Sequence, residues 1–146
     1  MIKDLAAVSK AHMARMCGQM TLCNIAVVAA GALGASGVAC GAFGAHALKG
    51  ALDGPHMLLW QTASLYHLLH ALALAAAASR LTPGQGGPWP GVCVAGFGAG
   101  VLLFSGSLYA LALGAPRAWG VVTPVGGLCL MAGWLALAAV GLNATR

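Results

Sequence analysis

The sequence predicts an all-α polytopic membrane protein, with four transmembrane helices in an antiparallel bundle and an N-terminal interfacial arm. Only 6% of its 146 residues are charged, whereas soluble domains carry about 25%. Four stretches contain no Asp, Glu, Lys or Arg, and each has the roughly 20 residues that a helix needs to cross a hydrocarbon core. These predicted spans are residues 22–43, 57–78, 91–113 and 119–142. A charge at the centre of a span would cost about 2.5–3.5 kcal/mol on insertion scales.

The first 20 residues form a polar and basic arm ahead of a transmembrane domain over residues 21–146. The arm carries Lys3, Lys10 and Arg15 but one acid, Asp4. Its composition is similar to that of a mitochondrial transit peptide, although Asp4 argues against one, and it lacks the apolar core of a signal peptide. We expect the arm to lie as an interfacial helix or to rest on a partner subunit.

The basic residues predict which way the spans run. The side that holds both termini carries five of them, whereas the loops 44–56 and 114–118 carry one each, Lys49 and Arg117. An excess of Lys and Arg marks the cytoplasmic side of a bacterial inner membrane, or the matrix side in a mitochondrion. Both termini are therefore expected there. The net charge of +5 follows from the same rule, and no basic run with interleaved aromatic residues indicates nucleic-acid binding.

Glycines recur at steps of three and four residues along the first span. Small residues let transmembrane helices approach closely. The glycine stripe is therefore expected to carry the closest helix contact, with the second or third span. Its members are Gly31, Gly34, Gly37, Gly41 and Gly44.

The second span gathers polar side chains on one half of a helix and leucines on the other. Because unpaired polar groups are costly in lipid, the polar half is expected to face inward. Tyr66 and His70 lie four residues apart and stack along this half. Gln61 falls on the leucine half, close enough to the start of the span to reach the interface. The polar half consists of Thr62, Ala63, Tyr66, His67, His70, Ala73 and Ala77.

Three roles compete for the two histidines. A haem lacks a facing ligand, because His46 lies at the membrane edge while His70 is roughly 20 Å deep; a haem shared between two copies stays open. A zinc or copper ion would find only two ligands. A hydrogen-bonded pair needs only Tyr109, Ser105 or a backbone carbonyl. We favour the hydrogen-bonded pair and expect no cofactor and no metal. Proton handling is the sharper alternative, weakened because no span contains Asp or Glu.

The third span carries small or polar residues on two faces. Ser105 and Tyr109 lie on one face, beside Gly98, and Ser107 and Gly100 lie on the opposite face. A helix at the rim of a bundle needs only one such face. We therefore expect the other face to meet an additional neighbour, either a second copy or another subunit.

The fourth span opens with Thr123 and Pro124, which leaves two possibilities. Either Pro124 is the first helical residue and Thr123 caps it, or Pro124 kinks a helix that begins at Trp119. Tryptophans fall mostly near the ends of the predicted spans, as expected of an aromatic belt. They are Trp60, Trp89, Trp119 and Trp134.

The residues show no catalytic constellation. The two acids, Asp4 and Asp53, are expected on opposite sides of the membrane, which excludes a carboxylate pair. The five cysteines share no metal-type spacing and are expected to pack as small apolar residues. An enzyme is therefore not expected.

Four motifs, in this order, resemble the small membrane-protein family represented by bacterial YgdD, which also includes the eukaryotic transmembrane protein 256. The motifs are GAFGAHAL (41–48), QTASLYHLLHALAL (61–74), LFSGSLYALAL (103–113) and VTPVGGLCLMAGW (122–134). The resemblance covers roughly residues 25–142 and implies a four-span inner-membrane protein, without an established activity. The arm looks longer than is usual for the family, and His67 stands outside its pattern. The matching motif residues include His46, Gln61, Tyr66, His70, Ser105, Ser107, Tyr109, Thr123, Pro124, Gly126 and Gly127.

Two functions remain. The first is a non-catalytic accessory or structural subunit of a larger inner-membrane complex, mitochondrial or bacterial, whose partners are the lipid bilayer and other membrane subunits or a second copy. The alternative is a membrane binding module for a lipid, a quinone or a proton at a face formed by Tyr66, His70 and Tyr109. Full pairing of the polar groups inside the bundle favours the first, and a ligand site within reach of His70 favours the second.

Overall fold

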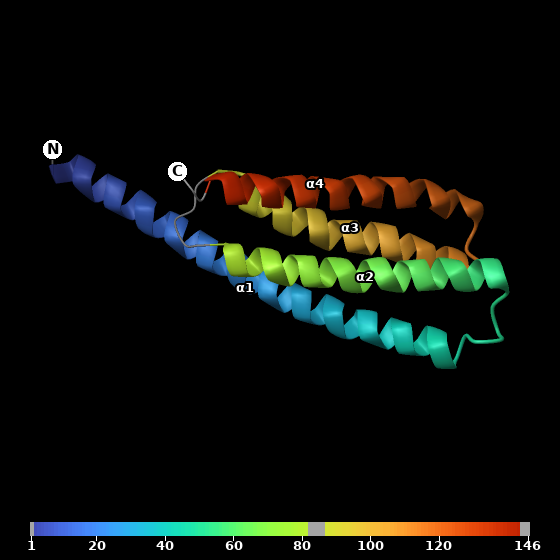
Figure 1. The fold of residues 1–146 in the computed structure, drawn as a ribbon. Helices are drawn as coiled ribbons and strands as arrows, with labels where there is room; N and C mark the ends of the chain where they lie inside the picture. The colour runs from blue at the N-terminus through green and yellow to red at the C-terminus, as the bar shows by residue number, and fades with distance from the viewer. Residues whose placement is uncertain (1, 82–86, 144–146) are drawn as a thin grey trace.

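The computed structural model describes residues 2–81 and 87–143, and its ordered elements there are helices (Figure 1). Four of them are long and apolar enough to cross a membrane, which confirms the predicted fold class. A short 3₁₀ helix, η1 (Arg117–Val121), precedes the last one. The four long helices are α1 (Ile2–His46), α2 (Gly54–Arg80), α3 (Trp89–Ala112) and α4 (Val122–Asn143).

Helix α2 begins three residues before the predicted span because of its cap. The Asp53 carboxylate accepts a hydrogen bond from the His56 backbone N–H at 2.9 Å, and Pro55 occupies the first turn, where no N–H is required. This bond is the main cause that lowers the pKa of Asp53 below its ordinary value, and a second contact to the His56 ring acts in the same direction. The prediction began at the first apolar residue, Met57, and so missed the cap.

The start of α4 settles the role of Pro124. The chain enters through η1, and Pro124 is the third residue of α4, within the first turn, where a missing N–H costs nothing. It therefore lies close to the first of the two predicted possibilities. Thr123 does not act as the predicted cap, since its hydroxyl lies 2.7 Å from that of Ser107 on α3.

The predicted arm is not separated from the first span. Residues 2–46 form one uninterrupted helix of 45 residues, about 68 Å long at 1.5 Å per residue. A hydrocarbon core is about 30 Å thick. The N-terminal part of α1 therefore projects well beyond the ends of the other helices, as Figure 1 shows.

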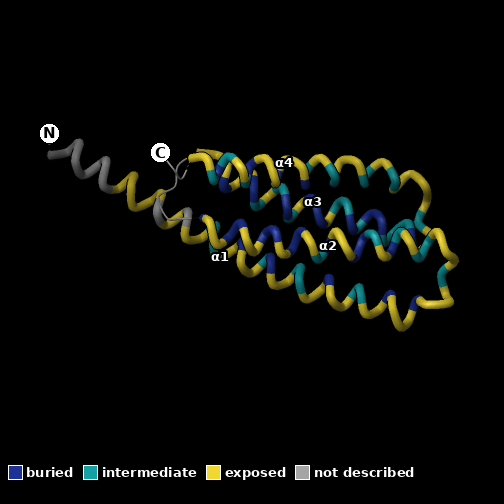
Figure 2. Tube along the Cα trace, viewed as in Figure 1, coloured by how far each residue is buried: buried dark blue, intermediate teal, exposed yellow. Residues whose placement is uncertain are grey.

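The helices are arranged in an open order. Helices α2 and α3 lie in the middle, α1 packs mainly on α2, α4 packs mainly on α3, and α1 does not touch α4 in the described part of the chain. Buried residues accordingly concentrate on α2 and α3, while α1 and α4 are exposed along much of their length (Figure 2). Because α1 meets essentially one neighbour, a wide face of it is left without a protein contact.

The closest approach of helix backbones joins α3 to α4 rather than involving the glycine stripe. A Cβ atom at Gly126 would lie 2.3 Å from the backbone nitrogen of Phe104, and one at Gly96 would lie 2.8 Å from that of Gly133. In the stripe, Gly37 and Gly44 do pack on α2, but against side chains, those of Leu68 and Trp60. The other three members, Gly31, Gly34 and Gly41, meet nothing within 4 Å.

The two small faces of α3 are both used inside the molecule. One carries Ser105 and Tyr109 and faces α2, and Tyr109 bonds to Ser64 there. The other carries Gly100 and Ser107 and faces α4. The expectation that the second face meets an additional subunit is therefore wrong, because α3 is an inner helix and not one at the rim.

Candidate functional site

The polar half of α2 divides between two sites that its two histidines occupy separately. His67 faces α1 and α3, where it meets Ser36 and Tyr109. His70 faces α3 and α4, where it meets Trp134. We call the first the His67 cluster, consisting of Ser36, Ser64, His67 and Tyr109. We call the second the His70 groove, whose aromatic wall consists of Tyr66, His70, Phe104 and Trp134.

The His67 cluster is a chain of hydrogen bonds that crosses from α1 to α3. His67 Nε2 lies 3.3 Å from the Ser36 hydroxyl, and Nδ1 lies 3.4 Å from the Tyr109 hydroxyl. The Tyr109 hydroxyl donates to Ser64 at 3.2 Å. The Tyr109 ring packs on Trp60, whose N–H donates to the Cys40 carbonyl at 2.9 Å and so joins α2 to α1.

Two arrangements of hydrogens keep both bonds to the His67 ring, because a hydroxyl both donates and accepts. In one, Ser36 donates to Nε2, and Nδ1–H donates to Tyr109. In the other, Nε2–H donates to Ser36, which donates to the Ala32 carbonyl at 2.8 Å, and Tyr109 turns its one O–H from Ser64 to Nδ1. A doubly protonated ring would donate to both hydroxyls. The cluster can therefore take up a proton without losing a hydrogen bond.

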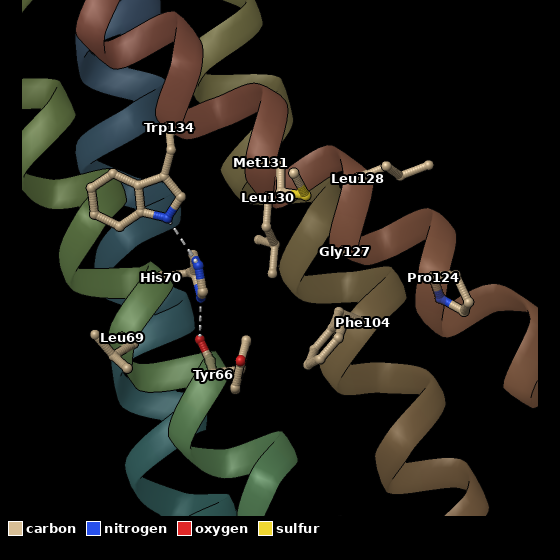
Figure 3. Close-up of a pocket in the computed structure, with 10 residues that line it drawn as sticks. All are labelled: Tyr66, Leu69, His70, Phe104, Pro124, Gly127, Leu128, Leu130, Met131 and Trp134. Carbon is tan, nitrogen blue, oxygen red and sulfur yellow. Dashed lines mark hydrogen bonds between the residues drawn. The ribbon is translucent and has the colours of Figure 1, made fainter.

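His70 is held in a single arrangement. The Trp134 indole N–H, which can only donate, lies 3.3 Å from His70 Nε2. Nε2 must therefore accept, the hydrogen is on Nδ1, and Nδ1 donates to the Tyr66 carbonyl at 2.8 Å (Figure 3). Both ring nitrogens are used, and a second proton on the ring would cost the bond from Trp134.

The His70 groove is an apolar hollow of about 710 Å³ between α2 and α4, floored by α3. The Tyr66 ring stacks on His70 and on Phe104, with ring centroids 5.6 and 4.6 Å apart. Tyr66 is 38% exposed, and within the described residues its hydroxyl has no hydrogen-bond partner. The groove is lined by Tyr66, Leu69, His70, Phe104, Pro124, Gly127, Leu128, Leu130, Met131 and Trp134 (Figure 3).

The residues predicted as one polar cluster are thus not together. Tyr66 and His70 line the groove, whereas Tyr109 belongs to the His67 cluster. Ser105 is buried between the helices, and its hydroxyl has no partner among the described residues. Of the other motif residues, Gln61 and His46 are exposed, the latter at the end of α1.

Sequence reasoning missed several members of both sites. His67 stands outside the family pattern, yet its ring bonds to both Ser36 and Tyr109. Ser36 was not singled out, although a polar residue in an apolar span was a usable signal. Trp134 was assigned to an aromatic belt, but it lies at the middle of α4 and bonds to His70. No three of His, Cys, Asp and Glu gather to hold a metal ion within residues 2–81 and 87–143.

Comparison with known proteins gives the same family as the motifs. The family model described as "Protein of unknown function (DUF423)" matches residues 40–127, a range that holds both histidines and Tyr109 but ends before Trp134. The chain is 44% identical to the UPF0382 inner membrane protein YgdD of Escherichia coli over 106 residues, covering 71% of this chain and 78% of YgdD. It is 40% identical to the UPF0382 membrane protein YwdK of Bacillus subtilis over 103 residues, covering 67% and 80%. No solved structure matches the chain.

Proposed function

Because the chain belongs to the DUF423 family of membrane proteins, whose activity is not assigned, we propose a role from its packing: a non-catalytic accessory or structural subunit of a larger inner-membrane assembly. That it is an integral membrane protein follows from its four apolar helices and from its relatives, which are named membrane proteins. The assembly role is the part that we propose. The partner is another membrane subunit or a second copy.

The observation that carries this proposal is the unpartnered face of α1. Gly31, Gly34 and Gly41 meet nothing within 4 Å. A glycine in a helix costs about 1 kcal/mol relative to alanine, and a face in contact with lipid gains nothing from that cost. Close approach of a second helix does gain from it, because small residues let two backbones come together. Only 17% of the 18-residue apolar stretch of α1 is buried against the rest of the chain, whereas 50% of the corresponding stretch of α3 is buried.

A leucine at Gly31 tests the proposal. Since nothing lies within 4 Å of that position, Gly31→Leu should leave the isolated chain folded, but it should abolish a larger species seen on blue-native electrophoresis of gently solubilised membranes. Gly141→Leu is the matched control, because Gly141 of α4 also has nothing within 4 Å. A wild-type chain that migrates only as a free small protein would contradict the assembly role.

The inner membrane, with both termini on the cytoplasmic side, is the location that we propose. The relative from Escherichia coli is named an inner membrane protein. The beginning of α1 and the end of α4 lie at the same end of the molecule (Figure 1), as an even number of crossings requires. Labelling of cysteines introduced at Lys10 and Lys49 with a membrane-impermeant reagent should reach Lys49→Cys alone from the outer side.

A second candidate function, the membrane binding module, is favoured by one observation. The His70 groove is open on the side of α2 and α4 and contains the Tyr66 hydroxyl, which has no hydrogen-bond partner in the described part of the chain. Tyr109, which was predicted to share this face, has its hydroxyl bonded within the His67 cluster. The groove therefore supports binding through Tyr66, with His70 as a member of its wall.

A further inference from the structure

We propose that the His70 groove binds a quinone-type lipid, that is, a molecule with a planar ring, a hydrogen-bonding oxygen on that ring and an apolar tail. The inference rests on the second candidate function and is independent of the assembly role. It depends on three properties of the groove: the depth of the free hydroxyl, the aromatic wall around it and the size of the hollow.

The depth of Tyr66 excludes the polar part of an ordinary phospholipid. Helix α2 has 27 residues from Gly54 to Arg80, so Tyr66 lies within one residue of its middle. The headgroups begin about 15 Å from the centre of a hydrocarbon core of about 30 Å. Moving a charged group from the headgroups to the depth of Tyr66 has a high free-energy cost. The oxygen that bonds to Tyr66 therefore belongs to an uncharged group that tolerates the middle of the bilayer.

Among the described residues that line the groove, the Tyr66 hydroxyl is the side-chain group left to bond to a ligand. The ring nitrogens of His70 are both occupied, by Trp134 and by the Tyr66 carbonyl. The Tyr66 hydroxyl has no partner among the described residues, and water is not available in the hydrocarbon core to supply one. A ring carbonyl or ring hydroxyl of the ligand would supply the missing bond.

The wall beside this hydroxyl suits a flat ring. Tyr66 and Phe104 are stacked, with an interplanar angle of 30°, and the Trp134 ring stands further along the groove (Figure 3). Aromatic rings prefer offset-stacked or edge-to-face neighbours. The hollow of about 710 Å³ falls within the roughly 300–1,000 Å³ usual for small-molecule sites. The ring lies beside Tyr66 and Phe104, and the tail leaves into the acyl chains.

Photolabelling of the full chain in phospholipid nanodiscs tests the proposal. The probe is an azidobenzoquinone with a decyl tail, and labelled residues are identified by mass spectrometry. Labelling should fall on groove residues such as Leu128 and Met131, should saturate, and should be competed by the decyl benzoquinone without the azide. Decylbenzene, which has the tail and a ring but no oxygen, should compete roughly two- to tenfold less well, the range of one hydrogen bond.

Two pairs of variants locate the site. Gly127→Leu fills the groove, and the fold tolerates it because a Cβ there would meet only Phe104 ring carbons at 3.8 and 3.9 Å; Gly98→Leu is its control, with nothing within 4 Å. Labelling should drop at least tenfold in the first and stay unchanged in the second. Tyr66→Phe should weaken competition by about two- to tenfold. Tyr109→Phe, which removes a hydroxyl outside the groove, should leave it unchanged. Elution on size exclusion checks that each variant is folded.

Several results would overturn the proposal. These are labelling that does not saturate, equal competition by decylbenzene, or equal losses in Gly127→Leu and Gly98→Leu. A photo-crosslinker at Leu128 that captures a protein chain in native membranes would show that a helix fills the groove instead. Photolabelling of the groove does not test the assembly role, which is tested separately by blue-native electrophoresis of the wild-type chain and of Gly31→Leu.

Discussion

His67 and His70 lie one turn apart on α2, yet their rings have hydrogen-bond partners of different kinds. His67 lies between two hydroxyls, each of which can donate or accept. His70 lies between a donor and an acceptor whose roles are fixed, the Trp134 N–H and the Tyr66 carbonyl. The first ring can exchange its hydrogens and the second cannot. The freedom of each of these two rings to exchange its hydrogens therefore follows from whether its partners are hydroxyls.

The largest expected effect separates the two rings by stability. His70→Leu leaves the Trp134 N–H without an acceptor and should lower the free energy of unfolding by about 1–2 kcal/mol. His67→Leu should cost only about 0.5 kcal/mol, since Ser36 keeps the Ala32 carbonyl and Tyr109 keeps Ser64. Unfolding by SDS in mixed micelles measures both, with His46→Leu as a surface control. Equal losses would mean that the number of polar neighbours matters and their type does not.

Trp134→Phe isolates the bond that fixes His70. The Trp134 and Phe97 rings meet edge to face, with centroids 5.2 Å apart. The smaller phenylalanine ring should keep this contact, but the N–H is lost. Interhelical hydrogen bonds in membranes are worth about 0.6 kcal/mol on average and about 1.7 at most, so the loss of stability should fall in that range. Trp119→Phe, at an exposed site, controls for the general cost of removing an indole. If Trp134→Phe left the free energy of unfolding unchanged, the bond from Trp134 would not be what holds His70 in place.

The positions of the ring hydrogens distinguish His67 from His70 directly, and this comparison requires no change in the stability of the chain. In the ¹⁵N spectrum of the histidine-labelled chain, His70 should show a single tautomer, with the hydrogen on Nδ1. His67 should show both, exchanging between the two arrangements of its cluster. Tyr109→Phe should change the proportions at His67 and leave His70 unaltered. One fixed tautomer at His67 would contradict the interchangeable cluster.

The smallest effect concerns the only acid among the described elements that caps a helix. The lowered pKa of Asp53 means that its carboxylate stabilises the folded chain above the ordinary value of 3.8, and this contribution is lost as the pH falls through the lowered value. Asp53 is fully exposed, so the change should be slight. Asp53→Asn should remove it in an acid titration of stability.

The spans were predictable because the cost of a charge in lipid is large and local, so the charge-free stretches mark them directly. The ends of the helices were harder to predict, because the cap of α2 depends on the carboxylate of Asp53, four residues before the apolar run that begins at Met57. The resemblance to the YgdD family is confirmed by the match to residues 40–127. It fixed the order of motifs but supplied no contacts between helices.

The partners of each polar residue were not predictable, because they depend on the order in which helices pack. A closed ring of helices would place α1 beside α4, and the sequence pattern does not distinguish that from the open order observed here. The inward half of α2 was predicted from its periodicity, yet the bond between His67 and Ser36 requires α1 to lie against that half. The bond from Trp134 likewise requires α4 to reach α2 across α3.

Helix α1 is continuous over its 45 residues and carries no proline, so its outer part leads into its inner part without a break. A tilt or rotation of the outer part is therefore passed along one helix toward the inner part. That rotation arrives where Gly37 meets Leu68 and where Ser36 touches His67. The outer end of α1 is in this way a mechanical handle on the His67 cluster.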